Sequence, residues 1–401
     1  MLLNDLERAV AEDAALRRRQ QLQPAGGRGD KIFPPTYPSD RGPIHVFERR
    51  RIAGEEKVCV LIDSVQSQAN RMEEALLAAA EAGRIPLPRL VVDFPGAGLN
   101  SVGPISVLEA PHRIFDAILR DSLIEGTSFR ESDLGQRLKR ATPAEASAIL
   151  EAAPTALLFG AWNSTGQGGG LGAKFARAIT SEIIAIDVPA EELVDRRTGE
   201  VTLGTSGRRT GGRIDPLGIP RSIAVFKTAK DWALDKTVLG KDAKQVRPSE
   251  INHGNIAPSI QALGITCDYA LQTLVLSFAG LRRLRFGTDP AKNQAARTYL
   301  AALGIVAALE ADRQGRALRS RCDLVCEGRA PLEIVAADGT VREVAIHPDA
   351  AVQLYKDAFD AACAAGFDLN PEPVMLKPQE KLVELVRRAQ EKALSDEGGE
   401  E

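Results

Sequence analysis

The sequence has few aromatic residues: Phe, Trp and Tyr together make up 4% of its 401 residues. No motif of the kind that stacks aromatic rings on unpaired bases is present, so extensive reading of a nucleic-acid sequence by stacking is not expected. The four histidines, His45, His112, His253 and His347, lie far apart, and neither an H-E-x-x-H nor a paired C-x-x-C pattern occurs. These absences argue against a metal site, and no cofactor is expected.

Cysteine and long apolar runs are also scarce. Five cysteines, an odd number spread along the chain, fit the reduced thiols of a cytoplasmic protein better than a disulfide scaffold. The first residues are acidic where a secretory signal would be basic. The most apolar stretch, Tyr269 to Leu281, is broken by Arg282 and Arg283 well before the roughly 20 residues that a membrane span needs. We expect a buried strand or helix there, and no membrane partner.

Charge of one sign does not dominate the chain. Lys and Arg number 51 and Asp and Glu 54, for a net charge of −3, so any nucleic-acid site must be local. Hydrophobic residues make up 44% and charged residues 26%, which is the usual mix of a folded globular protein. The length fits one large domain with insertions or two domains.

The first half of the chain predicts a mixed α+β organisation. Apolar positions with helical spacing run to about residue 23 and predict an N-terminal helical segment over 1–27. The next segments predict a strand over 57–63, a helix capped by Ser64 and a strand over 90–94. The simplest interpretation of this order is a β-α-β unit with its two strands parallel in one sheet. Further on, we expect a helix over 143–152 and a strand over 156–159.

A glycine-rich loop over 160–172 follows, with a helix from about 173 to 179. Residues 195–255 carry many Gly, Pro, Arg and Lys with little periodicity and are interpreted as a long insertion with extended loops. Downstream, the patterns predict a helix over 291–311, a half-buried strand over 317–326, a hairpin around Asp338-Gly339, and helices over 352–366 and 382–389. The acidic tail, 396–401, is expected to be frayed.

The composition of the glycine-rich loop is typical of phosphate-binding loops, because glycines let backbone N–H groups converge on an anion. The Walker pattern fails, since Ala173 separates Gly172 from Lys174 and Phe175 follows where Ser or Thr would hold magnesium. A plain flexible loop and a loop that contacts a nucleic-acid backbone both remain open, and nucleotide hydrolysis is the weakest alternative.

Basic residues concentrate next to this loop. Between Val201 and His253 there are ten basic residues against five acidic ones, a local balance of 10 − 5 = +5. Lys174 and Arg177 would share one face of the predicted helix. A solvated charged surface is the plain alternative, but the local excess favours a footprint on a phosphate backbone.

Two polar clusters could instead carry chemistry. The segment 249–255 contains Glu250 and His253, which can exchange protons near neutral pH, although loop capping or ligand contact is the simpler interpretation. Cys322 and Cys326 would share one face of the predicted strand as core thiols rather than bind zinc.

With these segments in place, the chain resembles the crRNA-binding backbone subunits of type I CRISPR interference complexes, the "Cas seven" family of the RAMP superfamily, in the form of subtype I-G (formerly I-U). The resemblance extends over roughly residues 28–375. It is carried by GDKIFPPTY at 29–37, LIDSVQSQANR at 61–71, GAWNS at 160–164, GLGAKFAR at 170–177, RIDPLG at 213–218 and EINHGN at 250–255.

The resemblance implies an α+β fold: an RRM-like (ferredoxin-like) palm over 28–375 with large inserted finger and thumb segments, the basic insertion over 195–255 among them, followed by a C-terminal helix and acidic tail over 376–401. It implies a non-catalytic subunit that oligomerises along the guide RNA as the backbone of the antiviral Cascade complex, with sequence specificity left to base pairing. The implied partners are CRISPR RNA, the target DNA strand, further copies of the chain in a helical filament, the large and the repeat-processing subunits, and a recruited helicase-nuclease.

The resemblance also suggests which residues contact RNA. Amide and guanidinium donors at the start of the first long helix suit phosphate and 2′-OH groups, with helix capping as the alternative. The candidates are Lys31, Gln66, Ser67, Gln68, Asn70, Arg71, Trp162, Asn163, Lys174, Arg177, Arg208, Arg209, Arg213, Asn252, His253 and Asn255. No catalytic residue is expected. The competing hypothesis is an endoribonuclease of the same superfamily that processes CRISPR RNA, with His253 or His112 as general base.

Overall fold

The computed structural model describes residues 1–40, 42–163, 172–194, 197–229 and 231–396. The chain has a mixed α/β structure and divides into two compact units. The first comprises Met1–Pro189 and Thr266–Leu382, and the second comprises Ala190–Ile265 and Val383–Glu401. The segment interpreted as an insertion, 195–255, lies within the second unit.

An antiparallel sheet forms the centre of the first unit. Its strands are β1 (Ala15–Pro24), β2 (Phe47–Ile52), β3 (Glu55–Asp63), β10 (Ile179–Ile186), β18 (Tyr269–Ser277), β19 (Arg316–Arg319), β20 (Cys322–Cys326), β21 (Leu332–Val335) and β22 (Val341–Val344). The order is β19-β20-β1-β18-β10-β3-β2, with the β21–β22 hairpin attached to β1. Central strands β1, β18 and β10 are paired over eight residues at each junction.

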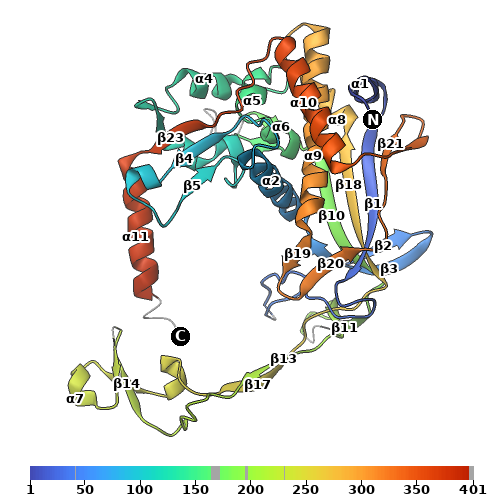
Figure 1. Ribbon diagram of the computed structural model, residues 1–401. Helices are drawn as coiled ribbons and strands as arrows, with labels where there is room; N and C mark the ends of the chain where they lie inside the picture. The colour runs from blue at the N-terminus through green and yellow to red at the C-terminus, as the bar shows by residue number, and fades with distance from the viewer. Residues whose placement is uncertain (41, 164–171, 195–196, 230, 397–401) are drawn as a thin grey trace. The chain divides into compact units, whose positions relative to one another are not determined.

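Two long helices, α2 (Val65–Glu81) and α9 (Pro290–Gln314), pack against each other beside this sheet (Figure 1). At Gly304, α9 packs closely on β18: a Cβ there would lie 3.1 Å from Leu276 Cδ2. Helix α10 (Pro348–Ala364) packs on α9, and the buried hydroxyls of Tyr299 and Tyr355 lie 3.2 Å apart. The short helices α1 (Leu3–Glu12), α6 (Thr155–Phe159) and α8 (Phe278–Leu281) contact α9 as well.

A second, smaller sheet completes the first unit. Its strands are β4 (Leu90–Asp93), β5 (Pro104–Ser106), β6 (Ser122–Ile124), β7 (Thr127–Ser128) and β23 (Val374–Pro378), in the order β5-β4-β23-β6-β7. The expected β-α-β unit is therefore wrong, because α2 leads from β3 in one sheet to β4 in the other, where β4 pairs in parallel with β23. Around this sheet lie η1 (Pro95–Ala97), η2 (Arg113–Phe115), α3 (Ala117–Arg120), α4 (Asp133–Arg140), α5 (Ser147–Ala152) and the start of α11 (Glu380–Asp396).

Several expected elements are confirmed. Ser64 caps α2, its hydroxyl oxygen accepting a hydrogen bond from the Ser67 N–H at 3.2 Å. The helix over 291–311 is α9, the Asp338-Gly339 hairpin joins β21 to β22, and the helices over 352–366 and 382–389 are α10 and α11. In each case capping, turn or apolar periodicity was a local signal that the packing supports.

Other expected elements are wrong. The N-terminal helix ends at Glu12, and the chain continues as β1, whose buried face carries Arg18 and Gln20 between Leu16 and Leu22. The helix expected over 143–152 begins only at Ser147, and 156–159 is helical, not extended. The single strand expected over 317–326 is the β19–β20 hairpin.

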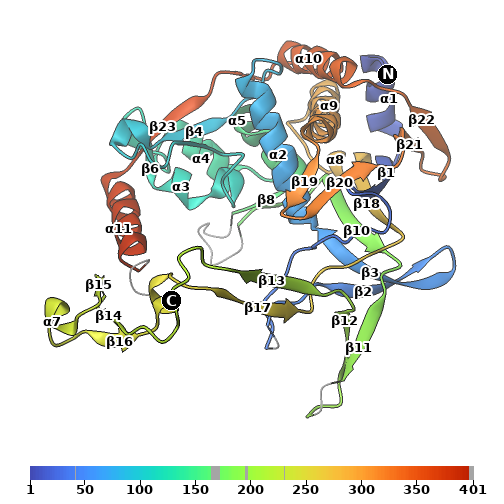
Figure 2. The ribbon, with the colours of Figure 1, turned by 60° about the horizontal axis from the view of Figure 1, so that its bottom comes forward.

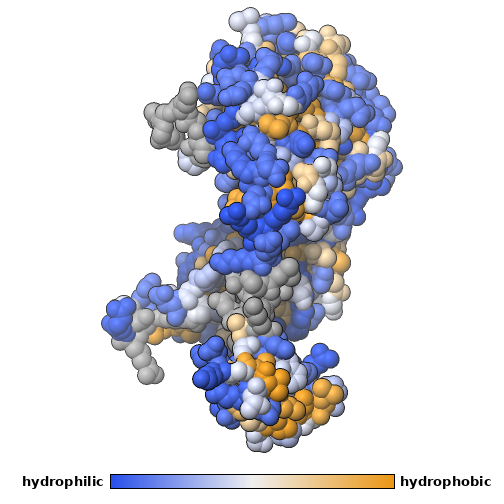
Figure 3. All heavy atoms as spheres, turned by 90° about the vertical axis from the view of Figure 1, so that its left-hand side faces the viewer, coloured by the Kyte–Doolittle hydropathy of each residue, from blue (hydrophilic) through white to orange (hydrophobic). Residues whose placement is uncertain are grey.

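The second unit consists of short strand pairs. Strands β11 (Ala190–Val194) and β12 (Val201–Thr205) pair, and β13 (Arg209–Arg213) pairs with β17 (Ile256–Gln261) as a two-stranded ribbon (Figure 2). In the sequence, the segment between β13 and β17 forms a three-stranded module. It consists of β14 (Val225–Lys227), β15 (Trp232–Ala233) and β16 (Lys244–Val246), with α7 (Lys236–Leu239) and η3 (Pro248–Ile251). Exposed apolar side chains gather on this module, including Trp232, Leu234 and Val238 (Figure 3).

Candidate nucleic-acid interface

The start of α2 is organised around a buried carboxylate. Asp63, the last residue of β3, is 0% exposed. Its two oxygens accept hydrogen bonds from four side chains: Ser67 Oγ at 2.8 Å, Gln68 Nε2 at 2.7 Å, Arg71 Nε at 3.0 Å and Arg319 Nη2 at 3.1 Å. Two of these donors are guanidinium groups, which form charge-assisted hydrogen bonds to the buried carboxyl group.

This arrangement divides the RNA-contact candidates of α2 into two groups. Gln68 is 5% exposed, and its amide oxygen accepts from Ser181 Oγ and Gln272 Nε2, each at 2.8 Å. Its amide is therefore used inside the protein, which argues against the direct RNA contact expected of Gln68. Ser67 and Arg71 are half-buried and bind Asp63, and Arg71 Nη2 also donates to the Leu318 carbonyl at 2.7 Å. Gln66 and Asn70 are exposed, one turn apart on α2.

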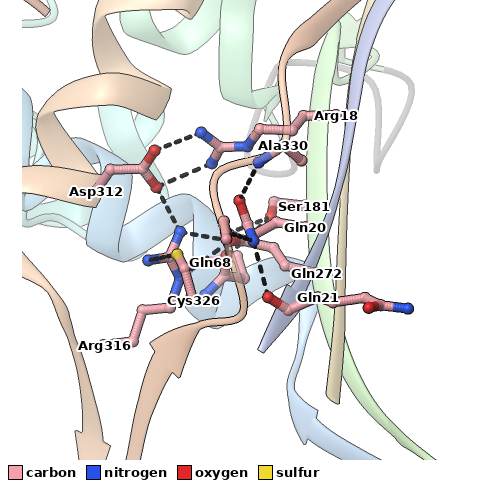
Figure 4. Close-up of polar contacts among 11 residues, drawn as sticks. Arg18, Gln20, Gln21, Gln68, Ser181, Gln272, Asp312, Arg316, Cys326 and Ala330 are labelled. Carbon is pink, nitrogen blue, oxygen red and sulfur yellow. Dashed lines mark hydrogen bonds and ion pairs between the residues drawn. The ribbon is translucent and has the colours of Figure 1, made fainter. Parts of the chain in front are cut away.

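A polar network continues from Gln68 across the sheet (Figure 4). The Gln272 amide oxygen accepts from Arg316 Nη2 at 2.8 Å, and Arg316 Nη2 also donates to Asp312 Oδ1 at 2.5 Å. Asp312 in turn pairs with Arg18, which is 2% exposed and donates through both terminal nitrogens. The sequence analysis did not find Arg18, Gln272 or Arg316; the only local signal is polar residues on the buried face of β1 and β18.

A second group of candidates lies on a short hairpin, β8 (Ala161–Trp162) paired with β9 (Lys174–Phe175). Trp162 is 50% exposed and lies opposite Lys174, whose Nζ is 6.0 Å from the centre of the indole ring. The Asn163 N–H donates to the Ala173 carbonyl at 3.1 Å. Most of the glycine-rich loop, 164–171, lies outside the described residues.

The helix expected over 173–179 is wrong. Lys174 and Phe175 form β9, and β10 begins at Ile179. Strand alternation exposes Lys174 while Phe175 is buried and stacks on Phe115, with ring centres 6.4 Å apart. Lys174 and Arg177 are both exposed, but from an extended segment rather than from one helix face.

Two arginines fix the base of this hairpin. Arg113 donates to both carboxylate oxygens of Glu73, at 2.6 and 2.7 Å, and to the Gly160 carbonyl at 3.2 Å. Arg177 Nε donates to the Phe159 carbonyl at 3.1 Å. Burial raises the pKa of Glu73 despite its ion pair. Partial burial, with the positive charge of Arg113 as a further cause, lowers the pKa of Arg177. The base of the hairpin thus holds an excess of positive charge.

Lys31 is half-buried, and its Nζ lies 6.0 Å from the centre of the Phe33 ring, which Arg321 also covers at 4.4 Å. Lys31, from the loop before β2, and Arg321, from the turn between β19 and β20, thus lie over one aromatic ring.

The remaining candidates belong to the second unit. Arg209 and Arg213 are exposed on β13, opposite Gln261 and Ile256 of β17. Arg208 is exposed and lies 3.3 Å from a carboxylate oxygen of Glu191. Three candidates follow η3. Asn252 adopts a left-handed conformation (φ 58°), His253 packs edge-on against Trp232 with ring centres 5.8 Å apart, and Asn255 Oδ1 accepts from the Asp215 N–H at 2.7 Å.

Asn252 thus ends η3, His253 packs against Trp232 and Asn255 binds the backbone at Asp215. His253 is half-buried, and Glu250 Oε1 accepts from the Arg247 N–H at 3.0 Å. The contacts of these residues fit loop capping, the simpler interpretation of 249–255.

The cysteines and histidines form no metal centre in the described residues: no group of three or more His, Cys, Asp or Glu side chains could hold an ion there. Cys322 is buried, but Cys326 is exposed and lies 3.5 Å from Arg316 Nη1, so the expectation of two core thiols holds only for Cys322. Within the described residues, no helix has the length and apolar character that crossing a bilayer requires.

Comparison with known proteins gives one family match. Residues 16–190 match the family described as CRISPR-associated protein GSU0053, and this match supports a CRISPR-associated protein. No curated protein matches the sequence. A solved chain described as "CRISPR RNA-guided surveillance complex, pre-nicking" aligns over 94% of this chain and 99% of its own, with 11% identity and a TM-score of 0.34.

Proposed function

We propose that this chain is a non-catalytic CRISPR RNA-binding subunit that oligomerises along the guide RNA and forms the backbone of a type I-G interference complex. The match of residues 16–190 to a CRISPR-associated family supports a role in CRISPR interference. The partners in this proposal are CRISPR RNA, the target DNA strand, further copies of the chain and the other Cascade subunits.

The observation that carries the proposal is the strand order of the first unit. Four of its strands with α2 and α9 follow the chain order β1-α2-β10-β18-α9-β20, and they pair in the spatial order β20-β1-β18-β10, all antiparallel. A β-α-β-β-α-β chain with this pairing is the ferredoxin-like arrangement. We assign these elements to an RRM-like palm, and we assign Ala190–Ile265, the part of the second unit inserted between β10 and β18, to a finger or thumb.

The distribution of cations supports RNA as the ligand. Lys174 and Arg177 are exposed on the first unit, and Arg209 and Arg213 are exposed on a β-ribbon of the second. Phosphate neutralisation by such side chains supplies most of the affinity of a protein that does not read bases. Exposed Trp162 offers one ring for stacking beside Lys174.

The experiment is to express the chain with its neighbouring CRISPR proteins and their array, purify the product by size and sequence the RNA that accompanies it. We expect array-derived spacer RNA in a particle many times heavier than one copy. A monomer free of RNA at low salt contradicts the proposal. Incubation with repeat RNA tests the enzymatic alternative: cleavage by the pure protein that is lost in His253→Ala or His112→Ala would replace the proposed function with that of a processing endoribonuclease.

A further inference from the structure

A groove lies where the end of β18 and α8 meet the segment between β9 and β10. It has a volume of about 330 Å³ and contains three cationic side chains, Lys174, Arg177 and Arg283. Arg283 comes from a part of the chain more than a hundred positions away from the other two. No carboxylate is among the described residues that line the groove. The fold therefore brings three cationic side chains together around one groove.

Small residues keep the floor of the groove open. Ala176, Ala279 and Gly280 line it, and Ala279 is exposed. A Cβ on Gly280 would lie 3.2 Å from Ser277 Oγ, which accepts a hydrogen bond from the Gly280 N–H at 2.9 Å. A polymer with a charged backbone can approach this floor closely because few side chains stand in its way.

Main-chain hydrogen bonds hold the two sides of the groove together. The Ser277 N–H donates to the Ala178 carbonyl at 2.7 Å, which joins the end of β18 to the start of β10. Arg282 Nη1 donates to the carbonyls of Val10 and Asp13, at 2.7 and 2.8 Å. Arg282 thus anchors α8 on α1, while the next residue, Arg283, lines the groove. The cations are presented by a framework that is already ordered, which lowers the entropy cost of binding.

The charge around α8 is positive beyond the groove itself. Burial lowers the pKa of Arg297, and the positive charges of Arg285 and Arg282 lower it further. The same mutual repulsion acts on Arg177 through Arg113. Positive groups that repel one another in the free protein gain when an anion binds among them.

We propose that this groove binds the phosphodiester backbone of single-stranded RNA and that Arg283 is a phosphate contact. Lys174 connects the groove to Trp162, since both lie on the β8–β9 hairpin and the Lys174 ammonium lies over the indole ring. A strand whose phosphates lie in the groove can therefore place a neighbouring base on that ring. This inference rests on the proposed function, because it takes RNA to be the ligand of the first unit.

The test compares variants at two positions in the purified full chain. Arg283→Ala removes the proposed contact, and Arg283→Lys keeps the charge. Ala279→Glu places a carboxylate on the exposed floor, and Ala279→Ser changes little there. Arg388→Ala, on α11, is the matched control for loss of one exposed arginine, since its side chain is 75% exposed and pairs only locally with Glu384.

The readout is the affinity for a fluorescent polyuridine oligonucleotide over a salt series, with thermal unfolding of each variant as a check on folding. We expect Arg283→Ala and Ala279→Glu to bind about three- to tenfold more weakly at low salt. Arg283→Ala should also flatten the slope of log K against log salt by about 0.7, the value for one phosphate contact on a single strand. Arg283→Lys, Ala279→Ser and Arg388→Ala should bind like the unaltered chain.

The outcomes separate this inference from the proposed function. If the unaltered chain binds polyuridine and Lys174→Ala weakens binding, while Arg283→Ala and Ala279→Glu bind normally, RNA does not enter this groove and the inference is wrong. If the unaltered chain does not bind RNA at all at low salt, the proposed function fails with it. Equal weakening by Arg283→Ala and Arg388→Ala would show nonspecific attraction to total charge and would also overturn the inference.

Discussion

Arg113 and Glu73 form a two-point ion pair, with Arg113 Nε and Nη2 donating to the two carboxylate oxygens of Glu73 at 2.6 and 2.7 Å. Glu73 is 1% exposed on α2, and Arg113 reaches it from η2. Arg113 also donates a hydrogen bond to the Gly160 carbonyl, so this pair links α2 to the point where the Trp162 hairpin begins.

Removing one partner of this pair should lower the free energy of unfolding. Glu73→Gln leaves the Arg113 guanidinium without its counter-charge in a largely buried place, and we expect a loss of about 3 kcal/mol in the free energy of unfolding. Denaturant unfolding measures this. The double variant Glu73→Gln with Arg113→Met should recover part of the loss, and a single variant as stable as the unaltered chain would contradict the role given to the pair.

Gly160 should not tolerate a side chain. Its φ is +85°, and a Cβ there would lie 2.9 Å from Arg177 Cγ and 3.1 Å from the Phe175 carbonyl oxygen. Gly160→Ala should therefore destabilise the fold by about 1–3 kcal/mol. In a Trp232→Phe background, the fluorescence of Trp162 reports whether the hairpin moves. Gly83→Ala, also at positive φ but with no atom within 4 Å, is the control for backbone strain alone.

The candidates on α2 should separate by phenotype. Gln68→Ala leaves Ser181, Gln272 and Asp63 each short of a buried partner, so we expect a loss of about 1–3 kcal/mol in stability. Gln66→Ala with Asn70→Ala removes exposed amides and should weaken RNA binding without lowering the unfolding temperature. Weaker RNA binding by fully folded Gln68→Ala, at unchanged stability, would argue against its internal role.

Lys174→Ala with Arg177→Ala should weaken binding of every spacer RNA by a similar factor, because both side chains neutralise phosphates and read no base. The slope of log K against log salt should fall by about 0.7 for each phosphate that is no longer neutralised. Parallel measurements on guides of unrelated sequence test this. A defect confined to one sequence would mean that these residues read bases instead.

Acid should weaken the contact between β6 and the start of α11. The hydrogen bond from Arg120, with that from Lys381, holds the pKa of Asp121 below its ordinary value. A carboxyl group with a lowered pKa in the folded state adds stability above its unfolded pKa, and this is lost as the pH falls through the folded pKa. We therefore expect Asp121→Asn to reduce stability at neutral pH and to show less further loss below about pH 4, the ordinary range of Asp. Identical pH profiles of stability for the two proteins would contradict this.

Local signals in the sequence predicted elements whose stabilising contacts are local. Ser64 at the start of α2 and the Ala- and Leu-rich composition of α9 are examples, because a cap and helix-forming residues act within a few residues. Long-range partners were not predictable in the same way. Nothing near Leu90 indicates that β4 pairs with β23, almost three hundred positions later, instead of with the sheet that contains β3.

The polar interior was also hidden from the sequence. Arg18 and Gln20 look like surface residues of a helix, and only their partners Asp312 and Gly328 explain why they are buried in a strand. Gln68 was named as a contact because its residue type suits RNA, but the same amide chemistry satisfies a buried neighbour equally well. In the sequence, Arg283 is notable only because it interrupts an apolar run. Its nearness to Lys174 arises from folding.

The strands on either side of the second unit are sheet neighbours, with Ile186 opposite Tyr269 and the Asp268 N–H donating to the Ile186 carbonyl at 3.1 Å. The chain therefore leaves and re-enters the first unit through the two ends of what would otherwise be an ordinary hairpin. Closing a longer loop at such a point costs only about 0.6 kcal/mol for each doubling of its length. This junction tolerates insertions: the segment between β10 and β18 could lengthen, shorten or be exchanged for another module while the pairing of the two strands stayed intact.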